Sequence, residues 1–129
     1  MPIMVTGGFR TLAGMNAALA SGEVDVVGIA RPLCVDPALP AKLVAGEVQA
    51  GRAYESELRI GPGLLGPHSR INFIKALNGW GQQGWFCLQL LRMGDGKDPD
   101  PGMGVFKAFL DYQKNEKRTA QSLDRDLAA

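Results

Sequence analysis

The sequence has only two cysteines and one histidine, which limits the chemistry its side chains can perform. Cys34 and Cys87 lie far apart and neither belongs to a CxxC motif, so we expect two buried, reduced thiols, not a disulfide framework or a zinc site. His68 lies in the stretch GPHSR, where the sequence shows no partner for acid–base work. We expect it to be a solvent-exposed loop residue, and we expect no metal site.

The chain also lacks a long apolar run and an excess of charge of either sign. No uninterrupted apolar stretch approaches the roughly 20 residues of a membrane span, and the N-terminus does not resemble a signal peptide. A soluble, cytoplasmic protein without a membrane partner is therefore expected. Lys and Arg number 14 against 13 acidic residues, and a net charge of +1 provides no general attraction to nucleic acid. Any anion site must be local.

Two clusters of charged residues are expected to be solvated rather than functional. Asp95, Asp98 and Asp100 do not have the spacing of a calcium-binding loop, so a solvated turn is expected there. The basic residues 114, 117 and 118 are interleaved with acidic ones and have no aromatic neighbours. This pattern predicts a solvated helix face and no nucleic-acid partner.

The 129 residues, 46% of them hydrophobic, are enough for one ordinary globular domain. Near the N-terminus, residues 3–5 and 24–30 are apolar without alternation, apart from Asp25. Runs of this kind are typical of strands that are buried on both faces of a parallel sheet. The sequence therefore predicts two parallel strands joined by a crossover.

A helical pattern follows each predicted strand. After the first, Thr11 is a candidate N-cap and Gly22 is placed to end the helix, and the apolar positions at helical spacing are Leu12, Met15 and Leu19. After the second, Asp36 is the candidate cap and Pro37 the first helical residue, and Gly46 stops the helix. Its expected inward-facing residues are Leu39, Leu43 and Val44. Two consecutive βα units are thus predicted in the first fifty residues.

From about Gly51 the composition of the sequence changes. The stretch RIGPGLLGPHS predicts a loop, because glycine and proline interrupt helices and strands. Two short helices are expected next, ending at Gly79 and Gly94, and then a final amphipathic helix with a frayed end. Their apolar stripes are Ile71, Ile74 and Leu77; Phe86, Leu90 and Met93; and Phe106, Phe109 and Leu110. The aromatic residues Trp80, Trp85 and Phe86 are expected to be core.

Glycine and arginine follow the two predicted strands. Gly7 and Gly8 come directly after the first strand, where backbone without a Cβ lets a bound group approach closely. Ala30 and Arg31 end the second strand, and arginine offers a planar fork of donors to an anion. The ends of parallel neighbours share one edge of the sheet, so a phosphate site is one interpretation. The other is a tight turn and a surface ion pair.

Three segments, PIMVTGGFRT, MNAALASGEVDVVGIARPL and DPALPAKLVAGE, closely resemble the last part of the barrel in the old yellow enzyme family of NADH:flavin oxidoreductases. The resemblance covers roughly the first fifty residues. It implies an α/β fold consisting of the last two βα units of a (β/α)8 TIM barrel, in residues 1–50, followed by a mostly helical extension, in residues 51–129.

The resemblance also implies a cofactor and its site. The cofactor is FMN, which accepts hydride from NADH or NADPH and passes it to an activated alkene or another small-molecule acceptor. Carried over by motif, Gly7 and Gly8 supply phosphate-facing amides, Ala30 contributes its backbone and Arg31 its side chain.

The chain departs from the family in beginning at what looks like the seventh strand. The segments expected to hold the flavin ring, the substrate-anchoring pair and the proton donor are absent, so no catalytic residue is assigned and turnover by this chain alone is not expected. The leading hypothesis is the FMN-phosphate-binding portion of an oxidoreductase, completed by the missing barrel. The alternatives are a non-catalytic flavin- or phosphate-binding module and an inert truncated product that self-associates.

Overall fold

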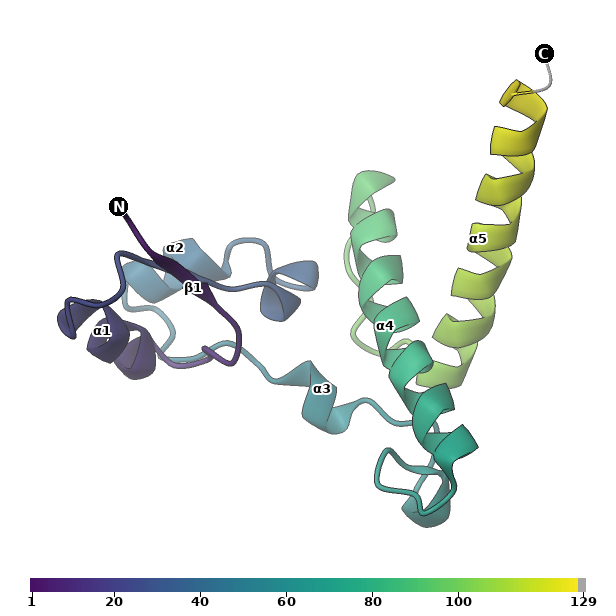
Figure 1. Cartoon of the computed structure of the whole chain (residues 1–129), viewed down its shortest axis with the longest axis horizontal. Helices are drawn as coiled ribbons and strands as arrows, with labels where there is room; N and C mark the ends of the chain where they lie inside the picture. Colours follow the sequence, from purple (N-terminus) through teal and green to yellow (C-terminus); the bar gives the residue numbers. More distant parts are fainter. Residues whose placement is uncertain (128–129) are drawn as a thin grey trace. The chain divides into compact units, whose positions relative to one another are not determined.

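A computed structural model describes residues 1–127 of the chain, which divides into two compact units (Figure 1). The first unit comprises Met1–Ser56, and the second begins at Glu57. The division lies a little beyond the boundary at residue 50 that the sequence suggested. The short helix α3 (Tyr54–Glu57) spans it.

The first unit contains the predicted strand–helix–strand arrangement. Strand β1 (Met4–Thr6) and strand β2 (Val26–Gly28) are parallel neighbours, joined by helix α1 (Leu12–Ala20). In their register Met4 pairs with Val26 and Thr6 with Gly28. The carboxyl ends of both strands therefore meet at one edge of the sheet, as the sequence analysis expected.

The expectation that both faces of these strands are buried is wrong. Val27 packs against a cluster built on Met15, Leu39 and Leu43, whereas Met4 is 65% exposed and Val26 47% exposed. Val5, which pairs with Val27 and shares its face of the sheet, is also 38% exposed. The helices of this unit therefore cover the two strands only in part, and apolar side chains of β1 and β2 are left in contact with solvent.

Helix α1 begins as its sequence predicts. The Thr11 side chain accepts a hydrogen bond from the Gly14 amide at 3.1 Å, which satisfies one of the free donors of the first turn. Gly22 follows the helix with φ +74°, a left-handed conformation that glycine adopts without strain.

The predicted start of the next helix is wrong. Helix α2 spans Leu39–Val44, with Pro40 in its first turn, and it follows the 3₁₀ helix η1 (Arg31–Cys34). Asp36 does not cap it, because its carboxylate pairs with Lys42, with Nζ and Oδ2 2.8 Å apart, and its carbonyl accepts from the Leu39 amide in a preceding turn. Leu39 and Leu43 are buried as expected, whereas Val44 is exposed.

The second unit contains one long helix where the sequence suggested two short ones. After the 3₁₀ helix η2 (Gly63–Leu65), helix α4 runs without a break through Asn72–Gly94. Gly79 lies in its interior and does not end it. A glycine inside a helix costs only about 1 kcal/mol relative to alanine, which tertiary packing on both sides of the position offsets.

The buried face of α4 is polar as well as apolar. Its side chains bind the backbone of both flanking segments: Asn78 accepts from the Ile60 amide and donates to the Leu65 carbonyl, and Gln82 donates to the Leu58 carbonyl. Further along, Gln89 pairs with both backbone groups of Asp100. Buried amides are stable here because they are hydrogen-bonded.

Helix α5 (Val105–Leu127) packs against α4 and runs in the same direction, because the intervening loop returns alongside α4 (Figure 1). The buried residues of its first turns are Val105 and Ala108, and not the predicted Phe106 and Leu110, which are exposed. Ala108 contacts α4 at a glycine, Gly84, where the two backbones approach closely.

The aromatic residues of α4 are only partly core. Trp85 is fully buried, donates its indole N–H to the Met103 carbonyl and meets Phe86 edge to face at 5.1 Å. Trp80 is exposed, so the expectation that it belongs to the core is wrong. His68 lies exposed in a turn, as expected.

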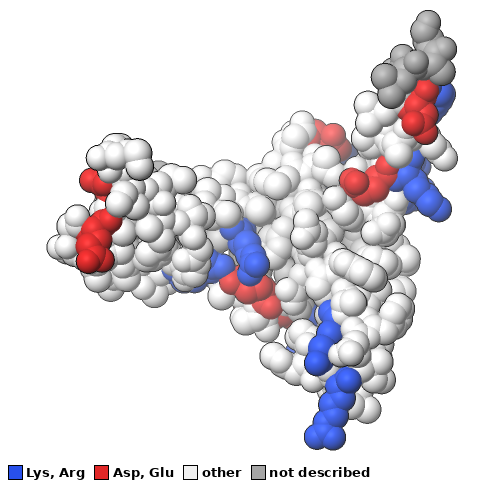
Figure 2. All heavy atoms as spheres, in the orientation of Figure 1, with Lys and Arg blue, Asp and Glu red and all other residues white. Residues whose placement is uncertain are grey.

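On the surface of the described residues, acidic and basic side chains are mixed (Figure 2), in keeping with the small net charge. On the visible face of α5, acidic and basic side chains lie next to one another (Figure 2). Within residues 1–127 no helix has the length and apolar character to cross a membrane, and no group of three or more metal-ligating side chains gathers.

A candidate anion-binding pocket

A pocket of about 230 Å³ lies at the carboxyl ends of β1 and β2, entirely within the first unit. The loop after β1 lines it with Gly7, Gly8 and Arg10, and the segment that follows β2 lines it with Ala30 and with Arg31, the first residue of η1. All four residues expected from the sequence to bind phosphate are therefore brought together. The remaining lining residues are Thr6, Phe9, Gly28, Ile29 and Glu55.

The glycines leave open space beside the backbone of this pocket. Gly7 has φ +121° and Gly8 φ +74°, and a Cβ at either position would meet no atom within 4 Å. The third glycine, Gly28, is required for a different reason. A Cβ there would lie 2.3 Å from the Thr6 hydroxyl on the paired strand.

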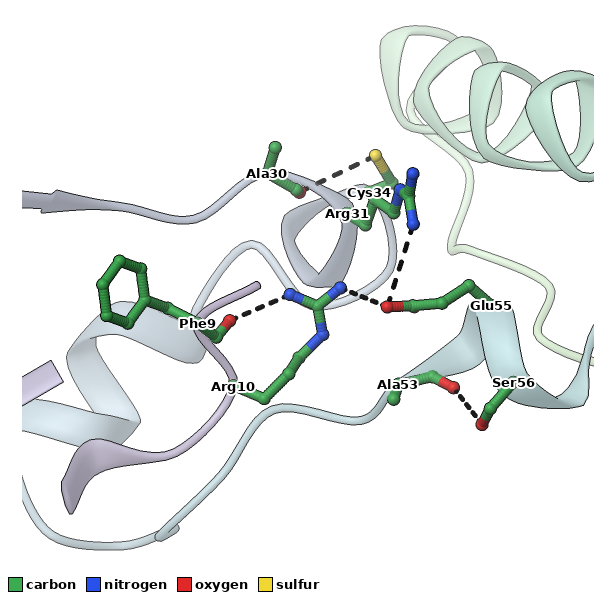
Figure 3. Close-up of polar contacts among 8 residues, drawn as sticks. All are labelled: Phe9, Arg10, Ala30, Arg31, Cys34, Ala53, Glu55 and Ser56. Carbon is green, nitrogen blue, oxygen red and sulfur yellow. Dashed lines mark hydrogen bonds and ion pairs between the residues drawn. The ribbon is translucent and has the colours of Figure 1, made fainter. Parts of the chain in front are cut away.

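Three charged side chains converge on the pocket, as Figure 3 shows. Arg10 donates one guanidinium N–H to the Phe9 carbonyl at 2.9 Å and pairs through another with Glu55 Oε1. Arg31 reaches the same oxygen at 3.9 Å from its Nη1. The Arg10 side chain is 20% exposed and that of Arg31 60% exposed, so Arg31 is the more accessible of the two cations from solvent.

Glu55 is ionised at neutral pH. Burial by itself would raise the pKa of its carboxyl, but a hydrogen bond from its own backbone and the hydrogen bond and charge of Arg10, together with the charge of Arg31, outweigh burial and lower the pKa below its ordinary value of 4.5. The carboxylate therefore contributes a full negative charge to the pocket wall.

Sequence reasoning missed Arg10 and Glu55. A signal for Arg10 was present, because it directly follows the TGGF turn that carries Gly7 and Gly8. The sequence carries no signal for Glu55, because this residue lies 45 residues after Arg10, in the four-residue helix α3. The chain returns there because the Gly51 amide donates to the Arg10 carbonyl and the Leu12 amide to the Gln49 carbonyl, each at 2.8 Å.

The pocket has the chemistry of an anion site. Two guanidinium groups and glycine-rich backbone supply donors, and the Arg10 Nε is buried without a hydrogen-bond partner among the described residues. The fit to a phosphate group rests on this set of donors and on the open space beside Gly7 and Gly8. The ionisable groups that line the pocket are two arginines and one ion-paired carboxylate, none of which donates a proton readily at neutral pH.

Over part of its length the chain is similar to proteins that are each named NADH-dependent flavin oxidoreductase. It is 48% identical over 44 residues to iliE of Neonectria sp. (strain DH2), which covers 34% of this chain and 6% of that protein. It is 31% identical over 90 residues to iccE of Talaromyces variabilis, covering 70% and 22%, respectively. It is 45% identical over 40 residues to iliE of Hypocrea jecorina (strain QM6a), covering 31% and 10%.

The chain thus corresponds to between 6% and 22% of the length of these curated relatives. No family model matches the sequence, and no solved structure is similar to it.

Proposed function

We propose that residues 1–56 bind the phosphate of FMN and form part of an NAD(P)H-dependent flavin oxidoreductase. The observation that carries the proposal is the pocket that unites Gly7, Gly8, Ala30 and Arg31 at adjacent strand ends. The names of the relatives supply the flavin and NADH. When bound, FMN would supply hydride transfer from NADH or NADPH to a small-molecule acceptor, as in the old yellow enzyme family.

Within this proposal, the four residues at the strand ends each have a defined task. The backbone of Gly7, Gly8 and Ala30 approaches the phosphate, because no side chain of Gly7 or Gly8 stands in the way. Arg31 supplies the exposed cation and a fork of donors. The chain's own contribution to the reaction is to hold and orient the cofactor through its phosphate.

We further propose that the two βα units are the seventh and eighth of a (β/α)8 TIM barrel. The parallel pairing of β1 and β2 with a helical crossover supports this, as does an anion pocket at their carboxyl ends. In that fold the loops after the last two strands frequently form a phosphate site.

A non-catalytic flavin- or phosphate-binding module is the second candidate function. It is favoured by the absence of a ready proton donor among the pocket-lining residues of the described chain. Both candidates require binding of the phosphate, and they differ in whether this polypeptide supports turnover.

Titration of FMN and of riboflavin with the full chain, followed by flavin fluorescence, tests the proposal. FMN should bind more tightly than riboflavin, which lacks the phosphate. Arg31→Ala should weaken FMN binding by about 2 kcal/mol, about thirtyfold, because a charge-assisted hydrogen bond is lost, and should leave riboflavin unaffected. Lys42→Ala is the matched control, because Lys42 pairs with Asp36 outside the pocket. Equal losses for FMN and riboflavin would contradict the phosphate assignment.

A further inference from the structure

Glu55 is a carboxylate in the wall of a pocket that otherwise has the character of an anion site. Its Oε1 contacts both cations of the pocket, Arg10 directly and Arg31 at 3.9 Å (Figure 3). The side chain is 26% exposed, so it is neither fully buried in the structure nor free in solvent. An anion that binds Arg31 must therefore do so beside a negative charge.

The three charged side chains that line the pocket balance to a net charge of +1. A phosphate monoester carries about −1.5 to −2 at pH 7 and can satisfy the exposed Arg31 while Arg10 stays on Glu55. An oxygen bonded to Arg31 lies within about 7 Å of Glu55 Oε1, since a hydrogen bond adds about 2.8 Å to the separation of Arg31 and Glu55. A ligand with a second phosphate carries further negative charge into this region.

We propose that Glu55 sets the charge of the ligand that the pocket accepts and makes it selective for a phosphate monoester over a diphosphate. This inference rests on the proposed function, because it presupposes an anion in the pocket. In that setting Glu55 is a specificity-determining residue, which rejects a dinucleotide or diphosphate by repulsion and by competition for Arg31. At about 7 Å and an effective dielectric constant of about 40, each added charge changes affinity by about five- to tenfold.

The variant Glu55→Gln separates charge from shape. Glutamine keeps an oxygen that accepts from Arg10, so the position of Arg10 is preserved while the negative charge is removed. Isothermal titration of the full chain with inorganic phosphate and with inorganic pyrophosphate should show about tenfold to a hundredfold tighter phosphate binding in this variant, because phosphate carries about 1.5 to 2 negative charges. Pyrophosphate binding should tighten by at least a further fivefold, so that the preference for phosphate shrinks or reverses.

Two further variants serve as controls. Glu47→Gln removes the same charge from an exposed position of the first unit outside the pocket and should change neither affinity. Glu55→Asp keeps the charge and should keep the preference for phosphate, even if the shorter side chain alters the pairing with Arg10. Circular dichroism of each protein establishes that its helices are intact.

The outcomes separate this inference from the proposed function. If the parent chain binds phosphate and Glu55→Gln leaves the ratio of the two affinities unchanged, the inference about Glu55 is overturned and the phosphate site stands. If Glu55→Gln weakens both anions equally, Glu55 only positions Arg10, and the inference is also overturned. If neither protein binds either anion, both the inference and the proposed function fail.

Discussion

At the residue scale, the backbone conformation of Gly8 and its place in the proposed anion site can be tested separately. It shares φ +74° and open surroundings with Gly22, which follows α1 outside the pocket. Any side chain at either position is strained by about 1–2 kcal/mol, because L-residues avoid the left-handed region. Only at Gly8 would the added Cβ also project where we propose that an anion binds.

Gly8→Ala and Gly22→Ala should therefore lower the free energy of unfolding of the chain by similar amounts. Only Gly8→Ala should also weaken binding of inorganic phosphate, as measured by isothermal titration. If both variants keep full affinity, the glycine at position 8 serves the turn and not the ligand.

The pairing of Arg10 with Glu55 predicts a specific titration behaviour. In Arg10→Gln the burial of Glu55 remains and its main counter-charge is lost, so the pKa of its carboxyl should rise. Carbon-13 NMR of the glutamate carboxyls measures this directly. Lys42→Gln should leave the Glu55 pKa where it is in the parent, because Lys42 pairs with Asp36.

The pairing of Arg10 with Glu55 also determines how the stability of the folded chain changes with pH. The pKa of Glu55 is lower in the folded chain than its ordinary value of 4.5, so its contribution to stability is complete above pH 4.5. That contribution is lost as the pH falls through the folded value. An Arg10→Gln chain whose Glu55 titrates as in the parent would show that the two side chains are not paired in solution.

Residues of the pocket were predictable where they lie next to a strand in the sequence. The meeting of parallel strand ends pointed to Gly7, Gly8 and Arg31, and the resemblance to the old yellow enzyme family added Ala30. Glu55 was not predicted, because its position depends on how the segment after α2 folds back and is hydrogen-bonded through Gly51 to Arg10. Contacts between segments far apart in the chain leave no local pattern in the sequence.

At the scale of elements, two of the glycines in α4, Gly79 and Gly81, have opposite roles. A Cβ at Gly79 would meet nothing within 4 Å, whereas a Cβ at Gly81 would lie 2.6 Å from the Val105 Cγ1 on α5. Val105 is buried and β-branched, so it has little freedom to move aside.

Gly79→Ala should therefore stabilise the second unit by about 0.5–1 kcal/mol, through helix propensity and a less flexible unfolded chain. Gly81→Ala should destabilise it by about 1–3 kcal/mol, through overpacking against α5. Urea unfolding followed by tryptophan fluorescence measures both, since both tryptophans lie in α4. Stabilisation by both alanines would contradict the close packing of α4 on α5.

The elements that were hardest to predict are those fixed by long-range contacts. Helix α4 continues through Gly79 because it is packed against α5 on the following turns, which no local propensity reveals. Asp36 looked like a cap, but Lys42 engages its carboxylate. By contrast, the cap at Thr11 depends only on the first turn of α1, and its prediction is confirmed.

At the scale of the whole molecule, the first unit presents an apolar strand face to solvent. Met4 and Val26, which pair with each other and so lie on the same face of the sheet, are exposed, and among the described residues β1 and β2 pair only with each other. Exposed apolar surface beside unpaired strand edges is a template for association.

The 129-residue chain should therefore self-associate, which light scattering over a range of concentrations measures. Met4→Lys together with Val26→Lys should shift the chain towards monomer, since charge on a strand face opposes pairing. The same preparation should oxidise NADH no faster than free FMN does, because we assign its pocket contacts to the phosphate only and none to the flavin ring. A concentration-independent monomer, or turnover well above that of free FMN, would contradict this prediction.

The 45-residue separation between Arg10 and Glu55 also affects the order of folding. Helix α1 forms from neighbours in the chain, but the wall of the pocket closes only after residues 49–51 have docked on residues 10–12. The entropy of closing this long loop must be overcome before the ion pair forms, so the proposed preference for a phosphate monoester, which depends on Glu55, should be among the last properties to appear during refolding. A nascent chain released before Glu55 would carry both strands and Arg31 but an unfinished pocket.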